Sequence, residues 1–433
     1  MRAGHAGGAA HAPTESGVGG FASFAATTVV WFDFYLYGTA AALVFAQLFF
    51  PATSSSASSL ASIAALSVTL VARPLGSIVF GVAGDLGGRK LMLVSALLTM
   101  TLATVLIGAL PGHGTLGETA TILLITLRFL QGFAIGGMWA GAATLALEHA
   151  PPRWRAFCAS WAHAGAPAAS VLASLTFLPL ATALPDEELL GWGWRVPFLA
   201  SGGMALVALV VLLLVKEPPT TVVARRTRPA RRSAPIIEVL TRYFPRVLVG
   251  TLAVAAGGTL LFVGNTFLFV SGSGDREGTL AATMLASGLT VLTIPLVALL
   301  ADLVGHRLMM QIGAGVTALV AVPILLLAQL GTPVGTLLAA LLALPIGYAF
   351  ASAALASWLP GLFETGVRAT GAGMTFQLGA CITFPLPYLA TSILSATGSG
   401  LLVGALIAVI AVLSLVAVSL LPRSPMEMEA RLR

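Results

Sequence analysis

The sequence predicts an all-α membrane protein, with twelve transmembrane helices in two pseudo-symmetric halves of six. The chain has 433 residues, of which 58% are hydrophobic and only 9% are charged, and its mean hydropathy is +0.97. A soluble domain carries about 25% charged residues. Apolar stretches recur at the length of about 20 residues that crosses a bilayer. A short loop pattern also occurs twice, 217 residues apart, which indicates that the two halves are related.

The apolar stretches define the order of the helices. They predict spans near 20–44, 58–82, 91–110, 119–142, 156–181, 195–215, 246–270, 279–300, 307–329, 333–355, 368–393 and 399–421. Many of the chain's 47 glycines fall within them, as suits helices that pack closely in lipid.

The segments outside the spans divide the chain. Residues 1–17 are polar, and we expect them to be a disordered N-terminus. Residues 18–215 form the first six-helix half and residues 246–421 the second. Between them, residues 216–245 carry a run of five arginines within residues 225–232 and predict a flexible cytoplasmic linker, and residues 422–433 predict a short cytoplasmic tail.

The positive charges predict the orientation. If both termini are cytoplasmic, 18 of the 22 Lys and Arg residues lie on the cytoplasmic side, and the opposite orientation reverses this bias. The same topology accounts for the net charge of +6 without a nucleic-acid partner.

The repeated loop pattern follows the second and eighth spans. The first copy is GVAGDLGGRK, Gly81 to Lys90, and the degenerate second copy is ADLVGHR, Ala301 to Arg307. Glycines let two helices end in a sharp turn, and an aspartate can face a helix N-terminus. We therefore expect the two loops to lie at the cytoplasmic seam between the halves; their candidate functional residues are Gly81, Asp85, Gly88, Arg89, Lys90, Asp302 and Arg307.

The first copy of this loop fits the pattern G-x-x-x-D-x-x-G-R-[R/K], and it resembles the signature loop of the major facilitator superfamily of transporters. Further segments resemble the metabolite:proton symporter branch of that superfamily, among them VVWFDFYLYGTAAALVFAQLFFP, RFLQGFAIGGMWAGAATLALEHAPPRWR, GWGWRVPFL and VRATGAGMTFQLG. The resemblance implies the major facilitator fold, symport with alternating access, and a place in the bacterial inner membrane. In such a transporter, the paired placement of the two loops predicts a gate that favours the outward-facing state. Two glutamates that are usual in this family are replaced here by Val30 and Met138. The proton path that the resemblance would imply therefore lacks two of its carboxylates.

Three charged side chains fall deep in the predicted membrane: Asp33, Arg73 and Arg128. By helix rise they lie roughly 20, 18 and 14 Å along the helix from Gly20, Asp85 and Thr119, near the middle of a hydrocarbon core about 30 Å thick. A charge at the bilayer centre costs about 2.5–3.5 kcal/mol, so each is a functional candidate. An ion pair between Asp33 and Arg73 would lower both costs and could be purely structural.

The deep charges sum to +1, and one guanidinium is left for an anionic substrate. The planar guanidinium group of arginine binds a carboxylate through two parallel hydrogen bonds. We therefore expect Arg128, assisted by Arg73, to bind the substrate and Asp33 to carry the coupled proton. Tyr37 lies one turn from Asp33, and Gln131 one turn from Arg128, so both are candidate binding residues.

Other polar residues in the spans are weaker candidates. His163 in the fifth span is either a hydrogen-bonded packing residue or a helper in proton movement. The second half contributes Asn265, Tyr348 and Gln377 as candidate binding residues, each of which suits a role in bridging helices at least as well.

Together these features predict a secondary transporter and not an enzyme. There is no Walker loop, no groupable catalytic triad and no cluster of metal-binding residues, so we expect no cofactor and no metal. The expected partners are protons, a small mono- or dicarboxylate and the lipid bilayer, and we expect a monomer that imports its substrate. Alternative interpretations are uptake of a zwitterionic osmolyte of the proline or betaine type, drug efflux, and a receptor or sensor that does not transport.

Overall fold

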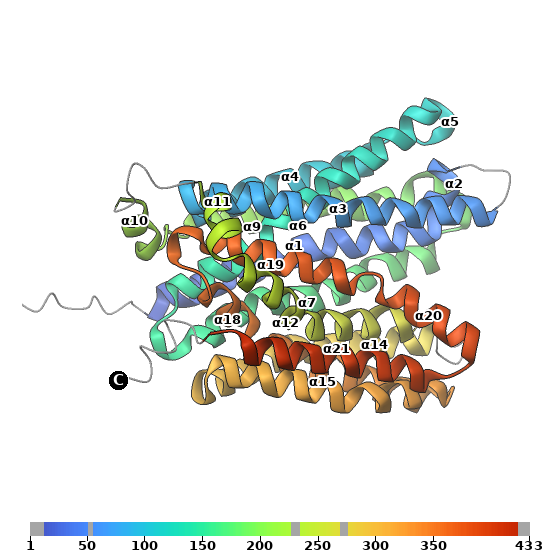
Figure 1. The fold of residues 1–433 in the computed structure, drawn as a ribbon. Coiled ribbons are helices and arrows are strands. Elements are labelled where there is room, and N and C mark those ends of the chain that lie inside the picture. The colour runs from blue at the N-terminus through green and yellow to red at the C-terminus, as the bar shows by residue number, and fades with distance from the viewer. Residues whose placement is uncertain (1–12, 51–54, 227–233, 269–275, 423–433) are drawn as a thin grey trace, which may run out of the picture.

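The computed structural model describes residues 13–50, 55–226, 234–268 and 276–422 of the 433-residue chain. Long helices run side by side through the molecule, and short helices lie at the two ends of the bundle (Figure 1). Helix α1 begins and helix α21 ends at the same end, which we call the terminal end; α5 and α20 lie toward the opposite end.

The N-terminal group of helices corresponds to the first six predicted spans. It comprises α1 (Pro13–Ala40) continued by η1 (Ala41–Phe45) and α2 (Ala46–Phe49), α3 (Ser55–Gly87), α4 (Arg89–Ala109), α5 (His113–Leu116), α6 (Glu118–His149), η2 (Pro152–Trp154), α7 (Arg155–Ala183), α8 (Asp186–Glu188), η3 (Leu189–Gly193) and α9 (Arg195–Leu214).

The C-terminal group corresponds to the other six. It comprises α12 (Phe244–Phe262) with η4 (Val263–Phe267), α14 (Arg276–Val304), α15 (His306–Gln329), α16 (Pro333–Leu341) with η5 (Leu342–Tyr348), α17 (Ala349–Ser352) and α18 (Leu355–Gly361), then η6 (Thr365–Val367), α19 (Arg368–Thr383), α20 (Leu386–Thr397) and α21 (Gly400–Leu420).

The described helices are long and apolar enough for a membrane. Eleven helical segments meet the length and hydropathy that a span requires. Helix α1 is not among the eleven, but it packs along α7 and α6 within the same bundle. The predicted all-α membrane fold is therefore confirmed.

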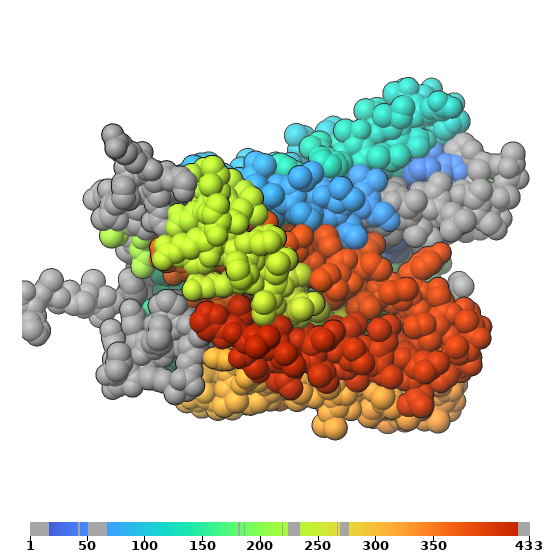
Figure 2. Space-filling view, in the orientation of Figure 1, coloured from blue at the N-terminus to red at the C-terminus, as the bar shows by residue number. Residues whose placement is uncertain are grey.

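Two pairs of helices make the main contact between the N-terminal and C-terminal groups. Helix α7 packs on α14, and α3 packs on α19. Figure 2 shows α19 lying against α3 on one face of the molecule. These pairs are equivalent in the two groups, because each joins the second helix of one group to the fifth helix of the other.

Glycine forms the turn in both copies of the repeated loop. Gly88 separates α3 from α4 with φ +118°, and Gly305 separates α14 from α15 with φ +101°. Side chains with a Cβ rarely adopt this region. The repeated pattern thus marks two turns of the same backbone type.

Glycines also bring α3 and α6 into backbone contact. A Cβ at Gly136 would overlap the carbonyl oxygen of Arg73, and a Cβ at Gly76 would overlap the carbonyl of Phe133. Such close approach is typical of small residues at helix interfaces in membranes. The contact fixes α3 against α6 on either side of Arg73.

The segments expected to be disordered or flexible are helical in part. Helix α1 begins at Pro13, before residue 17; residues 1–12 and the tail 423–433 lie outside the described residues. The expected linker contains α10 (Pro219–Arg226) and α11 (Pro235–Arg242). Both begin with proline, which favours the first position of a helix, and Val239 of α11 is fully buried.

The glycine contact between α3 and α6 predicts a position that does not tolerate a methyl group. We expect Gly136→Ala to lower the free energy of unfolding by about 1–3 kcal/mol, because the added Cβ overpacks two backbones. Thermal unfolding of the purified protein in one detergent measures this. Gly288→Ala is the matched control, since nothing lies within 4 Å of its Cβ. Equal melting temperatures for Gly136→Ala and wild type would contradict the packing argument.

Candidate functional site

Asp33 is fully buried in the N-terminal group of helices and is held by two hydroxyl groups. Thr104 on α4 donates to Oδ2 at 2.7 Å, and Ser201 on α9 donates to Oδ1 at 2.5 Å. The possible ion pair with Arg73 is absent, because no Arg73 nitrogen lies within 4 Å of Asp33 among the described ion pairs. The carboxylate is satisfied by hydrogen bonds from α4 and α9 instead.

Arg128 lies on α6 at the end of the same network. Its Nη1 donates to Oε1 of Gln131 at 2.8 Å, and Nε2 of Gln131 donates to Oγ1 of Thr104 at 2.8 Å. The guanidinium also lies over the ring of Tyr37, with 3.7 Å from Cζ to the ring centroid. The structure thus brings the predicted residues Asp33, Tyr37, Gln131 and Arg128 together.

Arg73 lies on α3 against the aromatic side chains of α1. Its guanidinium carbon is 5.0 Å from the ring centroid of Phe34 and 5.6 Å from that of Trp31. Its Nε and Nη2 are buried without a hydrogen-bond partner, as are Nε and Nη2 of Arg128. Buried polar groups rarely remain unpaired, so both guanidiniums hold donors that a ligand could satisfy.

His163 lies where the N-terminal and C-terminal groups meet. The indole of Trp139 donates to its Nε2 at 3.1 Å, and the hydroxyl of Tyr348 lies 3.5 Å from its Nδ1. An indole N–H can only donate, so Nε2 accepts and carries no proton. In this arrangement His163 is neutral and lies between hydrogen-bonding groups of α6 and η5.

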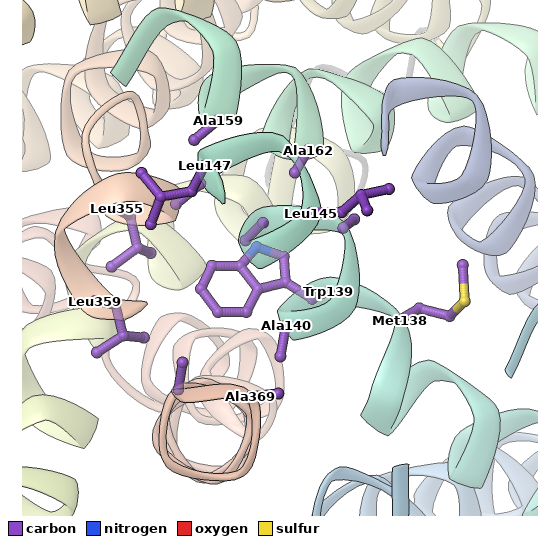
Figure 3. Close-up of a cluster of buried hydrophobic side chains, with 14 of the residues drawn as sticks. Met138, Trp139, Ala140, Leu145, Leu147, Ala159, Ala162, Leu355, Leu359 and Ala369 are labelled. Atoms are coloured by element: carbon purple, nitrogen blue, oxygen red, sulfur yellow. The ribbon is translucent and has the colours of Figure 1, made fainter. Parts of the chain in front are cut away.

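Aromatic stacking continues this bridge. The rings of Trp139 on α6 and Phe376 on α19 are parallel to within 6°, with centroids 3.8 Å apart. Figure 3 shows Trp139 in a cluster to which Leu355, Leu359 and Ala369 contribute, and the side chain of Met138, which belongs to the same cluster, points away from Trp139. Met138 and Val30, which replace the family glutamates, are both buried in the apolar core.

Gln377 and Asn265 also bridge helices. Nε2 of Gln377 donates to the carbonyls of Ile135 and Gly136 on α6, at 3.2 and 3.3 Å. Asn265 accepts from Ser170 on α7 at 3.0 Å. Each therefore joins the C-terminal group to the N-terminal group, as Tyr348 does through His163.

A second charged cluster closes the terminal end of the bundle. Asp85 on α3 accepts from the backbone N–H groups of Ala369 and Thr370 at 3.0 and 2.9 Å, and from the Thr370 hydroxyl at 2.7 Å. These residues form the first turn of α19, so Asp85 caps a helix of the other group. Gly81 permits this approach, since a Cβ there would lie 2.7 Å from Cα of Thr370.

Arg89 and Glu148 extend the cluster. Arg89 donates to Asp85 at 2.6 Å, to Glu148 at 3.4 Å and to the carbonyl of Thr365 at 2.9 Å. Glu148 also accepts from Arg368 at 2.9 Å and from the hydroxyl of Thr221. The network therefore ties α3, α6 and the linker helix α10 to the start of α19.

Asp302 makes the equivalent cap on the other side. It accepts from the backbone N–H groups of Ala156 and Phe157, the first turn of α7, at 2.8 and 2.9 Å. Thus the aspartate of each loop copy caps the fifth helix of the opposite group.

The remaining loop residues form a turn or join their loop to the end of a distant helix. Lys90 donates to the carbonyls of Leu213 and Val215 at 2.6 and 2.9 Å, beside the end of α9. Gly88 forms the positive-φ turn, and Arg307 donates to the carbonyl of Ser419.

Sequence reasoning missed several partners in these clusters. Thr104, Ser201, Glu148 and Arg368 were not predicted. The short repeat Arg-Ala at residues 155–156 and 368–369 marks the two capped helix starts and could have been found. Among the described residues, no three His, Cys, Asp or Glu side chains are grouped as a metal site requires.

The comparison with family models decides the identity. The model of the Major Facilitator Superfamily matches residues 23–385. The chain belongs to the major facilitator superfamily.

Relatives place the chain within the superfamily. It is 37% identical to the inner membrane metabolite transport protein YhjE of Escherichia coli K12 over 416 residues, 92% of each chain. It is 34% identical to the shikimate transporter of that strain, covering 83% of each chain. It is 27% identical to the E. coli K12 proline/betaine transporter, covering 89% of this chain and 79% of that protein. It is therefore a secondary transporter of the metabolite:proton symporter family, a multi-pass inner membrane protein and not an enzyme.

A solved structure shares the fold. The proton:xylose symporter XylE, bound to 6-bromo-6-deoxy-D-glucose, superposes with a TM-score of 0.76 at 14% identity, covering 97% of this chain and 99% of that one. At this identity the likeness supports the major facilitator fold alone.

The hydrogen bond between Trp139 and His163 predicts non-additive mutations. We expect His163→Leu to cost about 1–3 kcal/mol of stability, because it leaves a buried indole N–H without an acceptor. The double variant Trp139→Phe/His163→Leu should cost less than the sum of the two single changes. Thermal unfolding of the four proteins completes the cycle, and strictly additive losses would show that the bond contributes nothing.

Proposed function

We propose that this transporter imports a small organic anion, a mono- or dicarboxylate, together with protons. The observation that carries the proposal is the pair of deep guanidiniums. Arg73 and Arg128 each bury Nε and Nη2 without a partner, and neither forms a described ion pair with a carboxylate. A carboxylate binds these adjacent donors in parallel.

The charge balance favours an anion. Asp33, Arg73 and Arg128 sum to +1, and a surplus charge in the membrane is costly. A bound carboxylate supplies the missing negative charge. Tyr37 packs on the guanidinium of Arg128 and, together with Gln131, completes the proposed binding site. Tyr348, Asn265 and Gln377 would close it from the C-terminal group.

Asp33 is the proposed proton carrier. It is the carboxylate that the described structure buries in the middle of the N-terminal group, away from the cluster at the terminal end. Proton entry with an anion offsets the membrane potential, which opposes anion uptake by about 2.3 kcal/mol per charge at 100 mV. His163 bonds to Trp139 and Tyr348 in this state, and it would help only if that bridge opened.

The terminal end is the proposed cytoplasmic gate. The positive charges favour cytoplasmic termini, and the two aspartate caps join the groups at that end. We propose that residues 18–215 and 246–421 rock against each other about a midplane site. The closed caps then hold the outward-facing state.

A second candidate substrate is a zwitterionic osmolyte. One relative is a proline/betaine transporter, and a zwitterion also presents a carboxylate to arginine. The transport assay below separates the two. Drug efflux and a receptor without transport activity remain outcomes of the same assay.

Purified protein in liposomes tests the cargo and the coupling. We expect an inward proton gradient to drive accumulation of labelled shikimate or succinate, but not of betaine or proline. Arg128→Lys should abolish uptake despite keeping the charge, because the planar fork is lost. Arg153→Lys, at an exposed position, is the matched control and should transport normally.

Asp33→Asn separates proton coupling from binding. It should abolish accumulation under the proton gradient and leave exchange of labelled for unlabelled substrate intact. Undiminished accumulation by Asp33→Asn, or competition by neutral and cationic compounds alone, would refute the mechanism.

The gate predicts a loss of turnover with unchanged expression. Asp85→Asn and Asp302→Asn should each weaken the closed caps, because a neutral amide stabilises a helix N-terminus less than a carboxylate does. We expect the maximal uptake rate to fall while the amount of protein in the membrane stays constant. Glu118→Gln, an exposed change at the start of α6, is the control. Normal uptake by both aspartate variants would show that the caps are structural and do not act as a gate.

A further inference from the structure

Asp33 and Arg128 are joined by two neutral side chains rather than by direct contact. Nη1 of Arg128 is 2.8 Å from Oε1 of Gln131, Nε2 of Gln131 is 2.8 Å from Oγ1 of Thr104, and Oγ1 of Thr104 is 2.7 Å from Oδ2 of Asp33. All four residues are fully buried. The chain runs from α6 across α4 to α1.

The direction of these hydrogen bonds is fixed by chemistry. A guanidinium only donates, so the Gln131 atom that faces Arg128 is Oε1, and Nε2 faces Thr104. Thr104 then accepts from Gln131 and donates to Asp33. Every donor in the chain points toward the carboxylate, an order that suits the ionised form of Asp33.

We propose that Thr104 and Gln131 are positioning residues that link protonation of Asp33 to substrate binding at Arg128. This inference rests on the proposed function. A proton from the outside aqueous phase bonds to Oδ2 of Asp33, which then donates to Thr104. The Thr104 proton turns from Oδ2 to the carbonyl oxygen of Met100, which already lies 3.0 Å from Oγ1.

Oδ2 is the favoured oxygen for this proton. Thr104 has the Met100 carbonyl as a second acceptor, whereas Ser201, which donates to Oδ1, has no second acceptor among the described residues. When Asp33 donates to Thr104, the Thr104 proton moves to the Met100 carbonyl and the Ser201 proton stays on Oδ1. Each hydroxyl proton therefore keeps an acceptor.

Protonation changes how firmly the chain holds Arg128. An ionised Asp33 polarises Thr104 and Gln131 and so strengthens the bond at Nη1. The substrate carboxylate uses the same guanidinium at Nε and Nη2, which have no partner. Asp33 and the substrate thus compete for one cation, and the competition ends when Asp33 is neutral. Proton and anion therefore bind better together than apart.

Few other ionisable groups act on Asp33. Arg128 is the charged residue that interacts electrostatically with it. Helices α4 and α9 face it with hydroxyls, and their charged residues Arg89, Lys90 and Arg195 lie in the first turn of each helix. On α7, His163 bonds to Trp139 and Tyr348.

The test compares substrate affinity at an acidic and an alkaline pH in full-length protein. The probe is labelled shikimate or succinate, whichever the wild type accumulates. We expect wild-type affinity to fall about tenfold at alkaline pH, the change that one charge-assisted hydrogen bond accounts for. In Gln131→Leu and Thr104→Val the fall should be less than about threefold, and pH-driven accumulation should be lost.

Two control variants separate the link from general damage. Thr104→Ser keeps the hydroxyl and should retain the tenfold dependence. Ser201→Ala removes the other donor to Asp33 without touching the chain, and should also retain it. Infrared spectroscopy measures whether Asp33 still takes up a proton in each variant. The signal is a carboxylic-acid band that is present in the variant and absent from Asp33→Asn.

The outcomes are distinguishable. If the wild type accumulates neither anion, or shows no Asp33 band, the proposed function fails. If the wild type behaves as expected but Gln131→Leu and Thr104→Val keep its pH dependence, Arg128 and Asp33 interact through space and the link is wrong. Loss of the pH dependence in Ser201→Ala as well would also overturn it.

Discussion

The structure depends on carboxylates that cap helices of the opposite group. Asp85 satisfies the first turn of α19, and Asp302 satisfies the first turn of α7. The free N–H groups of a helix start need acceptors, and where two helices pack together at that start the aspartates supply them. Each cap therefore closes one helix and joins two groups of helices with the same atoms. Breaking the joint exposes two polar surfaces at once, which suits the proposed gate.

The deep arginines follow the opposite principle. At the terminal end, Arg89 is surrounded by Asp85, Glu148 and a backbone carbonyl, whereas Arg73 and Arg128 lie against aromatic rings with donors unused. Arg89 is paired with two carboxylates, although its Nε and that of Arg368 have no partner, and such a paired cluster is a stable closure. Arg73 and Arg128 have no carboxylate partner among the described ion pairs, so the proposed anionic ligand would lower the cost of burying them.

Much of the fold could be predicted from the sequence because lipid imposes length and polarity on each helix. Asp33, Arg73 and Arg128 stood out for the same reason, since few charges are tolerated at that depth. Helix rise gives the depth of a residue but not the direction in which its side chain leaves the helix. This is why the sequence allowed an ion pair between Asp33 and Arg73 that the described structure does not contain. Hydroxyls such as Thr104 and Ser201 carry no distinctive pattern, and the contact of Glu148 with Arg368 spans 220 residues of sequence. Tertiary packing alone brings these groups together.

The backbone contact between α3 and α6 has a consequence for selectivity. Gly76, Gly132 and Gly136 leave no room for the two helices to slide past each other. Arg73 and Arg128 lie on these two helices, so in the proposed transport cycle the spacing of the helix positions that carry their guanidiniums would stay constant while the C-terminal helices move. A substrate of the proposed site would meet a fixed separation of two positive charges in every conformation. Molecules whose acceptor groups do not match that separation would be rejected by distance, whichever side of the membrane they come from.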